Sequence, residues 1–179
     1  EKVEGIDGWS GVGMMAVANT RVVRRSAALM EQNQKSYGTN FTFGEHGLFS
    51  TKRTARLASY GSIIAFLVLA TPLKRLVRPF LPKPGEGPSQ ETQDNGWFRA
   101  TFVAYSDDNE KKICSMYGSG DPGYKSTAKL VCESALSLAR SADLPGGSEY
   151  GGVLTSAVGL GDVLIERLSN KEIEFKVLN

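Results

Sequence analysis

The sequence has few of the residues on which common catalytic and metal sites depend. It contains one histidine, His46, and two cysteines, Cys114 and Cys132, whose spacing matches no CxxC or other metal-binding pattern. No GxSxG, HExxH or Walker A motif occurs. The sequence therefore predicts no metal site and identifies no catalytic residue. For the two cysteines, buried free thiols in a reducing compartment fit better than a disulfide.

A dinucleotide-binding motif is present only in a weak form. The stretch "SGVGMMAV" has Gly11 and Gly13, with Ala16 in the position of the third glycine. The segment before it is interrupted by glycine and does not read as a strand, although the motif needs one. We therefore expect no nucleotide-binding site within this chain alone.

Charge is distributed unevenly, although the overall composition is that of an ordinary globular protein. Hydrophobic residues make up 41% and charged residues 22%, and the net charge is +2. Residues 1–83 hold 12 Lys and Arg against 5 Asp and Glu, whereas residues 84–179 hold 9 against 14. An anionic ligand or surface is therefore best sought in the first half. Nucleic acid is not indicated, because no basic stripe with interleaved aromatic residues occurs.

Periodicity predicts a mixture of helices and strands, and therefore an α+β or α/β fold. A helix is expected over residues 14–30, a short strand and loop over 37–50, and a hairpin over 97–119. A helix is expected to begin at Asp121-Pro122, a short strand lies at "GGVLT", Thr155 or Ser156 can cap a further helix, and "EIEFKV" alternates like a half-buried strand. The chain divides into a basic connecting region (1–50), an apolar to amphipathic helical segment (51–83), a linker (84–96) and an α+β subdomain (97–179).

The helical segment raises the question of a membrane. Between Arg56 and Lys74 lie 17 uncharged residues, which only reaches the lower limit of roughly 17–25 for a spanning helix. Pro72 breaks the run into an apolar helix and an amphipathic one. Surface contact with a membrane, packing in a soluble core and a true span all remain open. The membrane-contact candidates are Ile63, Phe66, Leu73, Leu76, Val77, Phe80 and Leu81.

Two other motifs can bind anions. In "NTRVVRRS" (residues 19–26), Arg24 and Arg25 lie within one helical turn of Arg21 and can hold a phosphate or carboxylate, although a solvated basic face explains them as well. In "GSGDPGY" (residues 118–124), Gly120 precedes a helix start that can approach an anion closely. A capped turn between strand and helix is the structural alternative for the second motif.

Taken in order along the chain, several motifs resemble the C-terminal half of the saccharopine dehydrogenase-like oxidoreductases, most of all the microbial and fungal members, some of which are named trans-acting enoyl reductases. The motifs are "NTRVVRRS", "LPKPGEGPS", "GWFR", "GDPGYKSTAKLVCESALSLA", "GGVLTSAVGLGDVLIERL" and "IEFKV". One departure is Ser156, where relatives commonly have proline. The resemblance covers nearly the whole chain.

The resemblance implies an NAD(P)-binding Rossmann domain upstream of residue 1. The present chain would then be a second, α+β domain with a mixed sheet and packed helices, which supplies substrate contacts or a homodimer surface. Asn19, Arg21 and Tyr124 are the candidates for the substrate cleft. The apolar segment with its basic flank favours a lipid-like enoyl or carbonyl substrate. An intracellular location is expected, on the cytosolic face of a membrane or lipid droplet or in the cytoplasm.

The alternative function is an interaction module without catalytic activity that attaches to a membrane or to a lipid droplet. The resemblance does not decide between the two, because a fold does not fix a reaction.

Overall fold

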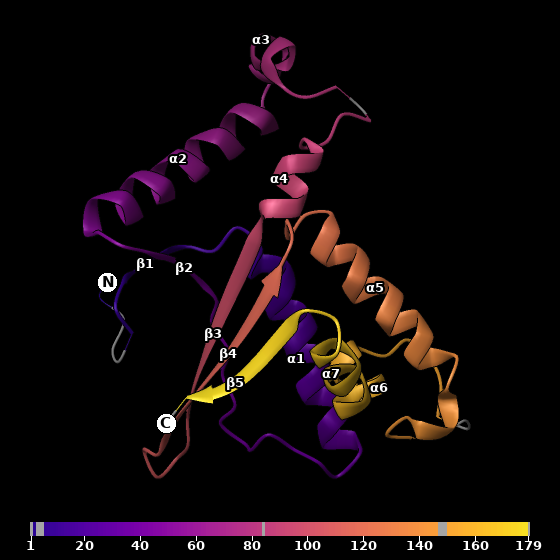
Figure 1. Ribbon diagram of the computed structural model, residues 1–179. Helices are drawn as coiled ribbons and strands as arrows, with labels where there is room; N and C mark the ends of the chain where they lie inside the picture. Colours follow the sequence, from indigo (N-terminus) through magenta and orange to yellow (C-terminus); the bar gives the residue numbers. More distant parts are fainter. Residues whose placement is uncertain (1, 3–5, 84, 147–149, 179) are drawn as a thin grey trace. The chain divides into compact units, whose positions relative to one another are not determined.

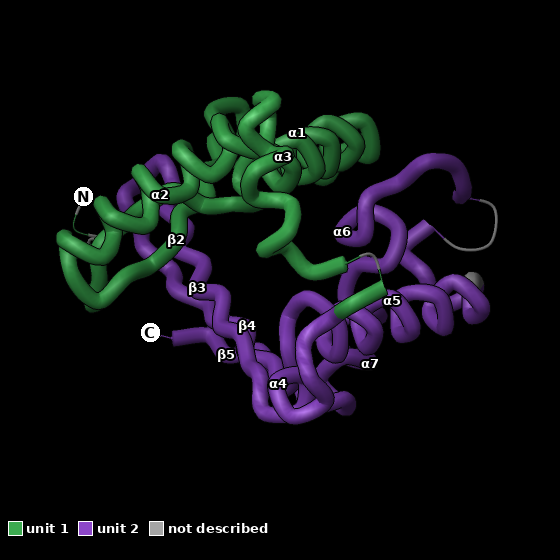
Figure 2. The backbone as a smooth tube through the Cα atoms, turned by 90° about the horizontal axis from the view of Figure 1, so that it is seen from above, with its two compact units in different colours: residues 1–86 green, residues 87–179 purple. Residues whose placement is uncertain are grey.

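Figure 1 shows the computed structural model of the protein, which describes residue 2 and residues 6–83, 85–146 and 150–178. The chain forms two compact units, residues 1–86 and residues 87–179, coloured separately in Figure 2. Both units combine helices with a small sheet, so the expected α+β class is confirmed. Each unit is described by itself below.

Unit 1 is built on a two-stranded antiparallel ribbon. Strand β1 (Trp9–Val12) pairs with β2 (His46–Phe49), and helix α1 (Ala16–Gln32) lies between them in the sequence. Helix α2 (Lys52–Ala70) packs on this ribbon. The contact is close because small residues face it: Ala55 is buried, and the N–H of Val12 donates to Oγ of Ser59 at 3.0 Å.

Helix α2 begins and ends at residues whose chemistry favours these boundaries. The Thr51 hydroxyl accepts from the N–H of Thr54, and the Thr54 hydroxyl accepts from the N–H of Thr51, which forms a capping box. The helix ends at Ala70, two residues before the expected break at Pro72. The second helix is shorter than expected, with four residues in α3 (Lys74–Val77) followed by a 3₁₀ turn, η1 (Arg78–Phe80). Pro79 explains this, because it has no N–H to continue an α-helix.

Unit 2 is a three-stranded sheet with helices. Its sheet has the order β3-β4-β5, with β3 (Trp97–Tyr105), β4 (Lys111–Ser119) and β5 (Ile173–Leu178), and the expected hairpin and final strand are confirmed. The expectation of one mixed sheet is wrong, because all described strand pairs are antiparallel and lie in two separate sheets. A short turn joins β3 to β4, and more than one helix separates β4 from β5. These connections differ from that of a parallel pair, in which a single helix usually leads from one strand to the next.

Unit 2 has four α-helices and one 3₁₀ turn among its described residues. They are α4 (Gln90–Asn95), α5 (Lys125–Leu138), η2 (Ser141–Asp143), α6 (Ser156–Gly159) and α7 (Gly161–Ser169). Helix α7 contacts both α5 and β5 (Figure 1). The buried apolar residues among the described ones of this unit are Val158, Leu160, Leu168 and Ile173. Gly118 lies opposite Phe98 and Ile173 in the sheet, where a larger side chain has no room.

Several local expectations in unit 2 are corrected by the structure. Helix α5 begins at Lys125 instead of at Pro122, although the Asp121 carboxylate still accepts from the N–H of Tyr124 at 2.7 Å. The stretch "GGVLT" forms no strand, and Gly152 has a φ of 128° that a strand does not adopt. The expectation that both cysteines are buried is wrong, because Cys132 is exposed and Cys114 is half-buried.

The expected linker, residues 84–96, contains the short helix α4, capped by the Ser89 hydroxyl, which accepts from the N–H of Thr92. Its first residue, Pro84, lies outside the described residues.

Candidate functional site

The glycine motif near the start of the chain lies partly within a strand and is followed by a helix. Strand β1 contains Gly11 and ends at Val12, so it overlaps the motif, and the described residues 6–8 before it form bends. The structure gives another reason for glycine at these two positions. A Cβ on Gly11 would lie 2.7 Å from the ring of Phe49 and 3.1 Å from Oγ of Ser59, and one on Gly13 would lie 3.1 Å from the carbonyl oxygen of Glu45. The protein's own chain therefore occupies the space beside both glycines.

The surroundings of α1 do not fit a dinucleotide either. In a Rossmann unit the motif joins a strand of a parallel sheet to the helix that follows it, and the N-terminus of this helix points at a pyrophosphate. Here β1 pairs antiparallel with β2. Within the first two turns of α1, the Asn19 amide donates to a carboxylate oxygen of Glu45 at 2.7 Å. A carboxylate in this place repels a pyrophosphate, so the start of α1 is not arranged like the pyrophosphate site of a Rossmann unit.

The two cleft candidates on α1 are not brought together. Asn19 is held by Glu45, which connects α1 to the loop before β2. Arg21 lies two positions further along the helix, which places it on nearly the opposite side. Arg21, Arg24 and Arg25 are all exposed and share one side of α1. Asn19 therefore connects α1 to the loop before β2, the arginines form a basic surface, and their contact with a substrate stays a prediction.

The third cleft candidate, Tyr124, lies in unit 2 at the turn that joins β4 to α5. Its side chain is 52% exposed and lies beside Gly87, whose added Cβ would contact the ring at 3.3 Å. Gly120 in the same turn has a φ of 94°, and its N–H donates to the carbonyl of Gly96 at 2.7 Å. The Ser126 hydroxyl donates to the carbonyls of Ser119 and Gly120. Internal bonds thus occupy the polar groups of this turn, so Gly120 offers no N–H to an anion.

The same end of unit 2 has an open pocket of about 540 Å³. It lies between α5 and the residues before β5, and its lining includes Lys125, Lys129, Cys132, Lys171 and Glu172. No motif in the sequence predicted this pocket. The spacing of Lys125 and Lys129, one helical turn apart, was a visible signal, but Glu172 is 43 residues away from Lys129 in the sequence.

Ion pairs neutralise much of the charge in this pocket. Nζ of Lys129 donates to the Glu172 carboxylate at 2.5 Å and the Ser119 hydroxyl donates to the same oxygen at 3.0 Å. These two hydrogen bonds, that from Lys129 first, hold the pKa of Glu172 below its usual value. Lys125 pairs with Asp94 at 2.6 Å, and their hydrogen bond raises the pKa of Lys125 and lowers that of Asp94. No three His, Cys, Asp or Glu side chains of the described part of the chain are grouped to hold a metal ion.

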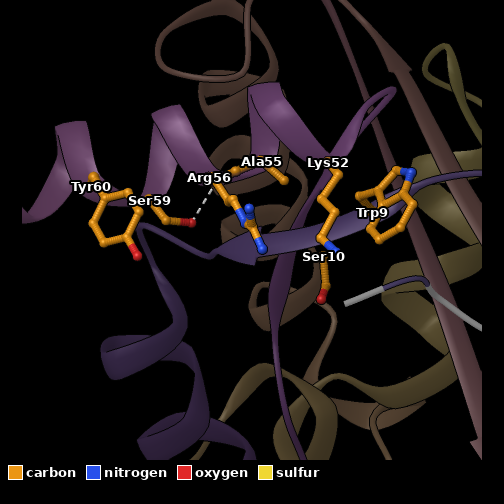
Figure 3. Close-up of a pocket in the computed structure, with 7 residues that line it drawn as sticks. All are labelled: Trp9, Ser10, Lys52, Ala55, Arg56, Ser59 and Tyr60. Carbon is orange, nitrogen blue, oxygen red and sulfur yellow. Dashed lines mark hydrogen bonds between the residues drawn. The ribbon is translucent and has the colours of Figure 1, made fainter.

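A second pocket, of about 300 Å³, lies in unit 1 between β1 and α2. Figure 3 shows Lys52 and Arg56 extending from α2 toward the strand that carries Trp9 and Ser10. Nζ of Lys52 lies 5.4 Å from the centre of the Trp9 ring, within cation–π range. Tyr60 closes the far end of the lining. The pocket thus combines two cations and two aromatic rings beside the apolar helix.

Most of the membrane-contact candidates are exposed apolar residues of unit 1. Phe80 is 86% exposed, Phe66 and Leu76 are each 71% exposed, and Val77 is half-buried. Ile63, Leu73 and Leu81 are also exposed. Packing in a core formed by the described residues is therefore excluded for most of this segment. By length and composition, α2 is the one described helix that could cross a membrane, a criterion that core helices and signal sequences also meet.

Comparison with known proteins connects the chain to one kind of reductase. It is 36% identical over 168 residues to a Mycobacterium tuberculosis protein provisionally named a trans-acting enoyl reductase. It is 35% identical over 169 residues to the trans-acting enoyl reductase of Mycobacterium bovis, and 33% identical over 168 residues to that of Mycobacterium ulcerans. No protein-family model and no solved structure matches the chain.

The similarity extends over most of this chain but over a minor part of the relatives. Each alignment covers 89% of the chain and 39% of the relative's length. The resemblance seen in the sequence motifs is thus supported in its enoyl reductase part. The chain is similar over nearly its whole length to part of the mycobacterial trans-acting enoyl reductases.

Proposed function

We propose that the chain is the substrate-side part of an NAD(P)H-dependent enoyl reductase of the saccharopine dehydrogenase-like type. The observation that carries the proposal is the similarity over 89% of the chain to proteins named trans-acting enoyl reductase. An enoyl reductase saturates a carbon–carbon double bond next to a carbonyl group. We assign the binding of the hydride donor to parts of the full-length protein outside this chain, because the glycine motif of β1 and α1 is filled by Phe49, Ser59 and Glu45.

A lipid-like substrate fits the surface of unit 1. The pocket between β1 and α2 is lined by Tyr60, which is 65% exposed, and the same helix carries further exposed apolar residues such as Leu57 at 75%. A long acyl chain can lie on such a surface, whereas a small dicarboxylic amino acid has no long apolar chain to bury there. Lys52 and Arg56 in the pocket can pair with a phosphate or carboxylate on the same substrate.

The proposal is tested on the full-length protein with enoyl thioesters of increasing chain length. We expect oxidation of NADPH or NADH that requires the double bond and a KM that falls as the acyl chain becomes longer. Tyr60→Ser should raise the KM for the long substrates several-fold and leave the short ones unchanged, and the matched control is Leu138→Ser on α5, which removes a similarly exposed apolar side chain in unit 2. Absence of any cofactor binding by the full-length protein would overturn the proposal.

The second candidate is an interaction module without catalytic activity. The exposure of Phe66, Leu76 and Phe80 favours it, because such a surface binds a partner whether or not the protein reduces anything. A full-length protein that binds no NAD(P)H yet binds lipid would support this function. Cofactor binding with turnover of an enoyl substrate would contradict it.

A further inference from the structure

We propose that residues 51–81 form a lipid-docking segment that lies in the plane of an anionic bilayer, with its outer face in the headgroup region, and does not cross the bilayer. The lipid-docking segment comprises α2, α3 and η1. This inference is independent of the proposed reductase function, because it depends only on the charge, exposure and packing of these residues.

The charge of the segment is of one sign. Residues 46–85 contain seven Lys and Arg and no Asp or Glu. Within the segment the cations form two exposed groups, one at each end of the apolar stretch, consisting of Lys52, Arg53 and Arg56 before it and Lys74, Arg75 and Arg78 after it. Two cationic groups without a carboxylate nearby in the sequence match a surface of lipid phosphates.

The exposed apolar residues lie along the same side of α2 as one of these cations. Leu57, Tyr60, Ile64 and Leu67 follow one another at intervals of three, four and three residues, which places them in one stripe. Their side chains are 55–75% exposed. Arg53, four residues before Leu57, lies at the start of the stripe. The stripe thus has its own cation at the level of the headgroups.

The opposite side of α2 packs on the β1–β2 ribbon. Ala55 is buried against the β1–β2 ribbon, and Oγ of Ser59 accepts from the N–H of Val12. The ribbon has two strands and is an open sheet. Open sheets do not occur within the hydrocarbon of a bilayer. Packing on the ribbon therefore keeps one side of α2 out of the bilayer.

The length of α2 also argues against a span. Its part without charged residues, from residue 57 to residue 70, is about 21 Å long at about 1.5 Å per residue. The hydrocarbon core is about 30 Å thick. A spanning position would pull Arg53 and Arg56 or Lys74 and Arg75 into hydrocarbon, whereas an in-plane position leaves both groups at the headgroups.

Beyond Pro72 the segment offers further side chains to the interface. Leu76 is 71% exposed and Phe80 is 86% exposed, and neither packs in a core of the described residues. Lys74, Arg75 and Arg78 alternate with them along α3 and η1. A protein partner would have to supply carboxylates opposite every one of these cations, whereas an anionic bilayer supplies phosphates along its whole surface.

The experiment measures binding of the protein to sedimenting vesicles of pure phosphatidylcholine and of phosphatidylcholine with about one third phosphatidylglycerol. We expect binding to the anionic vesicles that decreases with added salt, and little binding to the neutral ones. The triple change of Lys74, Arg75 and Arg78 to Gln should lower the partition coefficient on the order of 100-fold. The charge-matched control changes Arg21, Arg24 and Arg25 to Gln on α1, and it should lower binding far less.

The apolar contribution is tested with Leu76→Ser and Phe80→Ser, each expected to lower binding about tenfold or more. Leu138→Ser, 60% exposed on α5, is the control that should leave binding unchanged. If the serine variants lose the helical signal in circular dichroism, the Phe80→Trp variant is measured instead. The fluorescence emission of this tryptophan should shift to shorter wavelength only with anionic vesicles.

Three results would overturn the proposal. Equal binding to neutral and anionic vesicles would exclude the role of the cations. Equal binding of the segment variants and their controls would place the lipid contact elsewhere. Concentration-dependent dimerisation that the Leu76 and Phe80 variants abolish, without any vesicle binding, would show that a second copy of the chain covers this surface.

Discussion

At the scale of single residues, Gly118 is the position where the sheet of unit 2 tolerates least change. It is buried opposite Phe98, and an added Cβ would clash with the ring of Phe98 and lie 2.9 Å from Cδ1 of Ile173. We expect Gly118→Ala to reduce the free energy of unfolding by about 1–3 kcal/mol, because the close-packed neighbours must move. Denaturant unfolding measures the effect.

Gly151→Ala is the matched control for this change. Nothing lies within 4 Å of a Cβ added at Gly151, in a loop of the same unit. The control should leave the free energy of unfolding unchanged or raise it by less than about 1 kcal/mol. An equal loss for both variants would contradict the role assigned to the contact between Gly118 and Phe98.

Glu172 gives unit 2 a dependence on pH. Its φ is 63°, unusual for a residue with a side chain, and its carboxylate accepts from Lys129 and from Ser119. The hydrogen bond from Lys129, and then that from Ser119, lower the pKa of Glu172 below 4.5 in the folded state. The stabilisation of the folded state by these bonds is therefore complete above about pH 4.5. It is lost as the pH falls through the lower, folded value.

The prediction is a fall in the thermal midpoint as the pH drops below about 4.5, which Glu172→Gln reduces. The change should be small, because the ion pair is exposed to solvent. Glu110→Gln, which neutralises an exposed carboxylate in the turn between β3 and β4, is the control and should keep the wild-type profile. Identical profiles for the wild type and Glu172→Gln would refute the assignment.

At the scale of elements, the start of α2 is fixed by its capping box. Thr51→Ala removes the acceptor for the N–H of Thr54 and should cost about 1 kcal/mol. Circular dichroism should show a partial loss of helix, which also weakens the lipid-docking segment. Ser50→Ala, at the preceding exposed position, should not change the spectrum, and an equal loss from both changes would exclude the cap as the cause.

The elements that the sequence predicted correctly have local causes. The β3–β4 hairpin has apolar and aromatic arms around a polar turn, and α2 begins after a threonine cap. The elements that it missed depend on distant partners. Strand β1 depends on its pairing with β2. The first residue of β2, His46, lies 37 residues after the first residue of β1, Trp9. A short segment that contains glycine gives no sign of such a distant partner.

The same difference between local and distant partners decides which parts of the candidate site could be predicted from the sequence. The exposed apolar segment and its break near Pro72 could be predicted, because both follow from residues next to one another in the sequence. The bond between Asn19 and Glu45, 26 residues away, could not be predicted, because it leaves no local pattern in the sequence. The pocket beside Lys129 and Glu172 was missed because it joins residues 43 positions apart.

At the scale of the whole molecule, the two units differ in how much apolar core they contain. Among the described residues, the buried apolar side chains of unit 2 are Val158, Leu160, Leu168 and Ile173, whereas Ala55 is the one in unit 1. A folded domain needs a buried apolar core to offset the loss of chain entropy. Unit 2 therefore has the stronger basis for folding by itself.

We accordingly expect residues 87–179, expressed alone, to unfold cooperatively on heating, with a thermal midpoint within about 10 °C of that of unit 2 in the whole chain. Residues 1–86 alone should show helix in circular dichroism but a broad, weakly cooperative transition, because α2 leaves most of its apolar residues exposed. If anionic vesicles cover that surface, adding them should raise and sharpen the transition of the 1–86 fragment and leave that of the 87–179 fragment unchanged. A sharp transition for residues 1–86 in buffer, or none for residues 87–179, would show that the small number of buried apolar residues does not decide which unit is stable.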